Sequence, residues 1–136
     1  MADNLQQFNA EIQEFAKKVV PNEIVKFQKK IVLEALRRLV QKTPVDTGRA
    51  KGGWQVTIEA PASGQLDRTD KDGAGTVAEG LAAISHLPPW QMVWITNNVD
   101  YIEKLEHGMP GGSQQAPQGM VSVTVAELRS MFKEAA

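Results

Sequence analysis

The sequence of 136 residues contains no cysteine. This absence excludes a disulfide framework, a cysteine-based zinc site and a thiol nucleophile. Long hydrophobic runs are also absent, since none approaches the roughly 20 residues that a membrane-spanning helix needs. The first residues, MADNLQQFNAEIQEF, are polar and acidic, whereas a secretory leader would be basic and then apolar. We therefore expect neither a membrane span nor a signal peptide.

The composition is that of an ordinary globular chain. Hydrophobic residues make up 42% and charged residues 23%, both close to the average for folded domains. A chain of this length fits one domain that buries roughly two thirds of its unfolded surface. We therefore expect residues 1–136 to form a single domain.

The charge is balanced in total but unevenly distributed. The net charge is −1, yet the segment 17–51 holds ten basic and three acidic residues. That segment therefore carries +7, which leaves −8 for the rest of the chain. Such polarity is typical of contact with a polyanion or of head-to-tail contact between copies, and it also arises on a solvated helix face.

Two helices are expected in the first third of the chain. Apolar residues recur every three or four positions over 4–19, which predicts an amphipathic helix. Pro21 predicts a kink or break near Val20, because proline lacks the N–H group that a helix interior needs. Asn22 is a candidate N-cap for a second helix over 23–42, which ends before Thr43-Pro44.

The second helix has apolar residues on more than one side. The main apolar stripe of this helix lies on one side. Lys26, Lys30 and Arg37 form a basic row on the opposite side. Leu33 and Val40 flank this row. A helix of this kind is either central in its domain or shared with a neighbouring subunit.

The remaining chain predicts two strands, two shorter helices and a terminal helix. Alternation over 54–59 and an apolar run over 91–97 predict strands, the second of them central in its sheet. Residues 77–85 and 101–107 predict short helices, with Asp100 as a cap and Gly108 at the end of the second. Two flexible loops are expected, at about 60–76 and 108–119. A C-terminal amphipathic helix has its apolar stripe at Val121, Val125, Leu128, Phe132 and Ala135.

These elements predict a small single α+β domain. It has long N-terminal helices, a small antiparallel or mixed sheet and a C-terminal helix. The sequence contains no internal repeat.

The sharpest candidate for catalysis is Asp46-Thr47-Gly48, the triplet of aspartic proteases. That chemistry needs two carboxylates that share a proton, hence a second triplet or a dimer. Only one triplet is present, and it follows a basic helix and Pro44 rather than an apolar strand. We interpret it as a structural turn, in which Asp46 accepts backbone hydrogen bonds and Gly48 takes an unusual backbone conformation.

Other signals for chemistry are weak. Glu103, Glu106 and His107 lie together, but a catalytic zinc ion needs three well-placed ligands and the only other histidine is His86. The glycines of 73–80 do not match a nucleotide-binding loop. The three tryptophans lie on or beside strands, so we expect them in the core rather than in a base-stacking platform. We therefore expect no enzyme activity, no metal and no cofactor.

Two runs of sequence resemble a known family. The first is Thr-Pro-Val-Asp-Thr-Gly-Arg over 43–49, followed by Gly53-Trp54 and a strand. The second is Asn-Asn-Val-Asp-Tyr-Ile-Glu-Lys-Leu-Glu-His-Gly over 97–108, followed by a loop with proline and a terminal helix. In this order the runs resemble the neck or tail-completion proteins of tailed bacteriophages, over roughly residues 10–135. His107 departs from the tyrosine or phenylalanine that the family often has there.

The resemblance implies a structural protein of the virion, assembled in the host cytoplasm. Family members form rings, commonly hexamers, at the head–tail junction, and double-stranded DNA passes through them. Neighbouring neck, tail-terminator or tail-tube proteins would be the other partners, with no membrane involved. The basic row of Lys26, Lys30 and Arg37 would face the channel or a partner, and Leu33 and Val40 would contact the next subunit. The alternative is a nucleic-acid-binding module that uses the basic segment 17–51 without sequence specificity.

Overall fold

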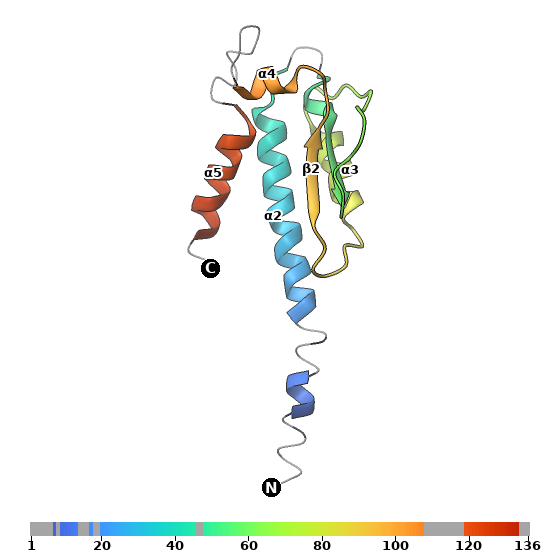
Figure 1. Cartoon of the computed structure of the whole chain (residues 1–136), viewed down its shortest axis with the longest axis vertical. Helices are drawn as coiled ribbons and strands as arrows, with labels where there is room; N and C mark the ends of the chain where they lie inside the picture. Colours follow the sequence, from blue (N-terminus) through green and yellow to red (C-terminus); the bar gives the residue numbers. More distant parts are fainter. Residues whose placement is uncertain are drawn as a thin grey trace.

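A long helix, α2, spans Val20–Lys42 and forms the axis of the molecule (Figure 1). The computed structural model describes residues 7, 9–13, 17, 20–45, 48–107 and 119–133. Pro21 lies in the first turn of α2, where a missing N–H costs nothing because first-turn N–H groups have no partner in the helix. The predicted start at residue 23 is therefore wrong, and Asn22 lies inside the helix rather than at its cap. The predicted end at Lys42 is confirmed.

The sheet has two antiparallel strands in the described chain. β1 spans Trp54–Ile58 and β2 spans Val93–Asn97, with Trp54 opposite Asn97 and Ile58 opposite Val93. Both strands were predicted, but a central position for β2 is wrong, because β1 is its only partner among the described residues. The apolar run is instead divided between core and surface: Val93 and Ile95 pack against the core, whereas Met92 is exposed.

The core lies between α2, β1 and the helix α3, which spans Ala74–Ala83. Leu36 of α2 is fully buried there. Gly80 of α3 allows the two helices to approach closely, because a Cβ atom at this position would lie 2.3 Å from Leu36 Cδ2. The glycine that weakens α3 as an isolated helix is therefore required by its packing.

A short 3-10 helix, η2, spans Lys51–Gly53 and leads into β1. The buried indole of Trp54 donates a hydrogen bond from Nε1 to Thr43 Oγ1 at 2.8 Å. That hydroxyl in turn donates to the Leu39 carbonyl at 2.6 Å. The end of α2 and the start of β1 are thus joined by a buried polar chain whose groups are all paired.

The loop before α3 ends at Gly73, three residues earlier than predicted. Gly73 has φ +86°, which favours glycine. Arg68 attaches the loop to the domain, since its guanidinium donates to the carbonyls of Gly52 at 2.8 Å and Trp54 at 3.2 Å. Flexibility of this loop stays a prediction, and residues 108–118 of the second predicted loop lie outside the described residues.

Helix α4 spans Ile102–His107, and α5 spans Val121–Phe132 along the other side of α2 from the sheet (Figure 1). The predicted apolar stripe of α5 is confirmed only in part, because Leu128 and Phe132 are half-buried and Ala135 lies outside the described residues. Val121 and Val125 are exposed, whereas Thr124 is buried. Overall the described chain has the predicted mixed α+β architecture of one small domain with a C-terminal helix.

Candidate functional site

The predicted basic row lies on the surface. Lys26, Lys30 and Arg37 are all exposed on α2. Lys26 contacts Glu23 one turn away at 3.5 Å, and both side chains are mostly in solvent. Lys30 and Arg37 make no ion pair with any described residue. The row is therefore available to a partner.

The two apolar residues that flank this row differ in burial. Leu33 is half-buried, but Val40 is only 4% exposed and belongs to the core. The first turn of α3 covers Val40, because a Cβ atom on Gly73 would lie 2.1 Å from Val40 Cγ1. Val40 therefore packs inside its own chain, and its predicted role as a subunit contact is wrong.

Asp46 and Thr47 of the predicted turn lie outside the described residues. Gly48 has φ +88°, and its carbonyl accepts hydrogen bonds from the backbone N–H groups of Gly52 and Asp70, both at 2.9 Å. A Cβ atom at Gly48 would lie 2.9 Å from the backbone of Asp70. Gly48 is therefore placed where only glycine fits both the conformation and the space.

Several other described bases of the segment 17–51 have partners inside the fold. Arg38 and Lys42 form ion pairs with Glu127 of α5, the second at 2.7 Å. Lys29 donates to the Ser85 carbonyl at 3.0 Å. Lys51 is buried. The positive charge of this segment thus holds the domain together at several points, and only part of it faces outward.

Two carboxylates act as helix caps, and neither was singled out for this role from the sequence. Glu106 of α4 accepts backbone hydrogen bonds at the start of α5, from Met120 and Val121 at 2.8 Å and Ser122 at 3.0 Å. Partial burial raises the pKa of the Glu106 carboxyl, but these hydrogen bonds lower it more, so the pKa lies below its usual range. No local signal predicts this cap, because Glu106 is fourteen residues from Met120.

The second cap is Asp70, before α3. Its carboxylate accepts from Gly73 N at 3.0 Å, Thr76 N at 2.8 Å and Thr76 Oγ1 at 2.7 Å. Partial burial raises its pKa, but the hydrogen bonds from Thr76 and Gly73 lower it below its usual range. The sequence does carry a signal here, since an aspartate shortly before a glycine and a helix is typical of such caps.

A groove of about 510 Å³ lies between α2 and the start of α3, with Arg37 and Lys51 among the residues that line it. The carboxylates of Asp70 and Asp72 already neutralise the partial positive charge at the N-terminus of α3 beside the groove. They accept hydrogen bonds from the N–H groups at the start of this helix. Because these acids offset the two bases, the groove is a poor site for an anion.

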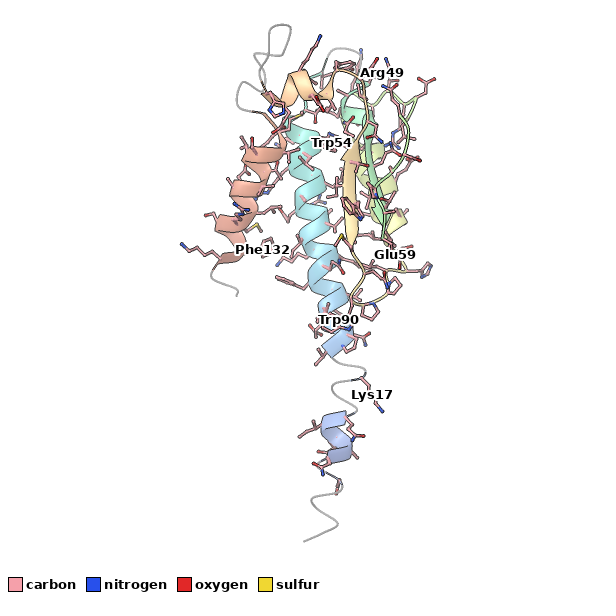
Figure 2. All side chains as sticks on the ribbon, in the orientation of Figure 1. Lys17, Arg49, Trp54, Glu59, Trp90 and Phe132 are labelled. Carbon is pink, nitrogen blue, oxygen red and sulfur yellow. The ribbon has the colours of Figure 1, made fainter. Side chains whose placement is uncertain are left out.

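A different groove, of about 490 Å³, has an apolar lining. Its walls are the first half of α2 and the loop before β2, and the residues are Ile24, Phe27, Gln28, Ile31, Trp90, Gln91 and Met92. Trp90 is 68% exposed, Met92 61% and Phe27 48%. Figure 2 shows Trp90 beside the N-terminal part of α2. We call this feature the apolar groove.

The apolar groove has a defined shape. Gln28 Nε2 donates to the Gln91 carbonyl at 2.6 Å, which holds the loop against α2. Phe27 packs edge-on against Phe132 of α5, with ring centroids 5.5 Å apart. Of the three tryptophans expected in the core, Trp54 is buried, but the expectation for Trp90 is wrong, because it lies on the loop after Pro88-Pro89, where no described element covers it.

The described residues contain no group of three or more histidine, aspartate or glutamate side chains placed to hold a metal ion. Among the helices of the described chain, none is long and apolar enough to cross a membrane. The chain matches no protein-family profile, no curated protein and no solved structure. The arrangement offers an apolar groove and an exposed basic row on one helix, and both are features of an interaction surface.

Proposed function

We propose that this chain is a structural protein of a tailed-bacteriophage particle. It forms a homo-oligomeric ring, expected to be a hexamer, at the head–tail junction as a neck or tail-completion protein, and DNA passes through the ring. The observation that carries the proposal is the apolar groove, a large apolar surface between α2 and the loop before β2 that no described element covers. Soluble monomers seldom leave such a surface uncovered, and it is typical of protein–protein contact.

The residues that resemble the phage family support this proposal through their structural roles. Thr43 bonds to Trp54, which joins the first run of similarity to the strand that follows it. Asn97, at the start of the second run, donates from Nδ2 to the Ala50 carbonyl at 2.8 Å. A Cβ atom on Gly53 would lie 2.6 Å from Val99 Cγ2. Both runs therefore lie close together where α2 ends and β1 begins, as expected for sequence signals that specify the fold.

The charge distribution is compatible with a ring around DNA. DNA must slide through a channel, and each additional lysine or arginine contact to phosphate strengthens binding and makes it more salt-dependent. Lys26, Lys30 and Arg37 are a short row rather than an extended basic surface, because Lys29, Arg38 and Lys42 have partners inside the domain. A row of this size provides weak contact with a polyanion or with an acidic partner.

The test is to locate the chain in particles of the phage that carries its gene. A reconstruction of the head–tail junction should contain a ring into which the α2–sheet–α5 domain fits, and purified chain should associate as its concentration rises. A reconstruction in which every ring of the neck and upper tail is accounted for by other proteins would refute the proposal.

The second candidate is a nucleic-acid-binding module that uses the basic segment 17–51. The exposure of Lys26, Lys30 and Arg37 favours it. It predicts DNA binding that falls steeply with salt and is abolished when all three residues are changed to glutamate. Absence of binding by the unmodified chain at low salt would end this candidate.

A further inference from the structure

The sequence contains an apolar segment near its start that has the character of an occupant for the apolar groove. Residues 1–16, which we call the N-terminal arm, have apolar residues at Leu5, Phe8, Ile12 and Phe15, spaced for one stripe of a helix. Residues 9–13 are helical and fully on the surface, with Ile12 51% exposed. A helix with such a stripe is stable only when the stripe is buried against something.

The described helical part of the arm, residues 9–13, lies away from the groove of its own chain. Residues 9–13 lie beyond the N-terminal end of α2 and clear of the domain (Figure 1). The groove lies in the opposite direction, along α2 from Ile24 to Ile31. Residues 9–13 are therefore presented to a neighbouring molecule rather than to their own domain.

Charge favours the same pairing. Residues 1–16 contain three acids, Asp3, Glu11 and Glu14, and no base. The first half of α2, residues 20–31, has three bases and one acid; none of these bases lines the groove, but their field attracts an acidic arm from a distance. Opposite charges on two surfaces orient their encounter and select the correct partner.

We propose that the apolar groove binds the N-terminal arm of a second copy of this chain. The mode is a helix in a groove, with Ile12 and its neighbours on the stripe against Phe27, Trp90 and Met92. Because the arm and the groove are different surfaces, the contact is heterologous, and repetition of it generates a closed ring or an open stack. The inference rests on the proposed function for the identity of the assembly, and it adds which surfaces join the copies.

The absence of cysteine makes a direct test possible. Two populations of full-length chain, one with Ile12→Cys and the other with Met92→Cys, are mixed and oxidised. A second mixture pairs Ile12→Cys with Trp90→Cys. The control pairs Ile12→Cys with Lys104→Cys, an exposed position on α4 at the other end of the molecule (Figure 1). We expect the groove pairs to form a cross-chain disulfide at least about tenfold faster than the control, because a bound arm raises the effective thiol concentration toward the millimolar range.

Sedimentation of the unmodified chain separates this inference from the proposed function. If the chain associates but neither groove pair forms faster than the control, the arm–groove contact is wrong and the ring proposal survives. If an Ile12→Cys/Met92→Cys double variant links only within one chain, the arm binds its own groove and the inference is wrong. If the chain stays monomeric at all concentrations, both fail. Two results together establish the contact. The groove pairs link across chains faster than the control, and Ile12→Asp and Met92→Asp variants remain folded but associate more weakly.

Discussion

The two halves of α2 have the same secondary structure but different surroundings. The second half, from Val32 to Lys42, is covered by α3 on one side and by α5 on the other, and it contains every buried residue of the helix. The first half, from Val20 to Ile31, has no fully buried residue and forms one wall of the apolar groove. One half of the helix thus stabilises the domain, and the other presents a surface.

The charges follow the same division except at Arg37, which lies in the second half but is exposed and has no ion pair with a described residue. Arg38 and Lys42 in the second half are paired with Glu127 of α5. Lys26 in the first half contacts only the exposed Glu23, and Lys30 has no acidic partner among the described residues. Substitutions in the second half should therefore act on folding stability, and substitutions in the first half on association.

The largest expected effect is the loss of stability on Leu36→Ala. Leu36 is 0% exposed, and its side chain packs against α3 at Gly80. Truncation removes buried apolar atoms and leaves a cavity, which costs about 3 kcal/mol of unfolding free energy. Urea denaturation followed by circular dichroism measures the change.

The matched variant in the first half is Phe27→Ala. Its ring is half exposed and loses mainly the edge-on contact with Phe132, worth about 1 kcal/mol. Equal losses for the two variants would contradict the division of α2 into a stabilising half and a presenting half.

Next in size is the removal of the cap of α5 by Glu106→Gln. An amide accepts fewer and weaker hydrogen bonds than a carboxylate, so we expect a loss of about 1 kcal/mol. The pH dependence gives a second readout. Because the folded pKa of Glu106 is below its usual value of about 4.3, its bonds stabilise the fold above that pH, and the benefit is lost as the pH falls through the folded pKa.

Thermal unfolding at pH 7 and pH 3 measures this dependence. The variant should differ more from the unmodified chain at pH 7 than at pH 3. The lowered pKa of Asp70 gives the stability a pH dependence of the same sign. This contribution is present in both proteins, so it cancels when the variant is compared with the unmodified chain. A difference between variant and unmodified chain that does not change with pH would show that Glu106 does not act through its charge.

The elements of this fold were largely predictable because their signals are local. Alternation in β1 and the end of α2 at Thr43-Pro44 depend on residues within a few positions of each other, and both are confirmed. The start of α2 was misjudged by three residues, because proline both breaks a helix interior and suits a first turn. The residues around Pro21 are compatible both with a helix that breaks there and with a helix that begins there.

The surfaces were less predictable because they depend on contacts between distant segments. Val40 is buried only because Gly73 brings the start of α3 against it. The exposure of Val121 and Val125 follows from the orientation of α5, whose first turn is held by Glu106 of α4. The exposure of Trp90 depends on a loop that no other element covers. In each case the periodicity identified apolar residues but not which neighbour would cover them.

A smaller effect is expected from breaking ion pairs on the two halves. Glu127→Gln removes the acid that pairs with Arg38 and Lys42, so it should lower the thermal midpoint at low salt and do so less in 1 M salt. The side chains of Lys26 and Glu23 are mostly in solvent, so the control Glu23→Gln should leave the midpoint unchanged. If both variants behave alike, α5 is not held to α2 by charge.

The smallest effect on stability is expected for the triple change of Lys26, Lys30 and Arg37 to glutamate. All three side chains are exposed on α2, so the free energy of unfolding should stay within about 0.5 kcal/mol of the unmodified value. Association should weaken at low salt, because the acidic arm is then repelled at a distance by an acidic helix, and the difference should shrink as salt screens the repulsion.

This last variant also separates the two candidate functions. If the unmodified chain binds DNA at low salt and the variant loses that binding while association is unchanged, the row is a DNA contact, and its charge plays no part in joining the copies. If association weakens and the unmodified chain has no measurable DNA affinity, the row serves contact between copies. The first half of α2, which contributes least to stability, would then be the half that joins copies of the chain, together with the exposed Arg37 of the second half.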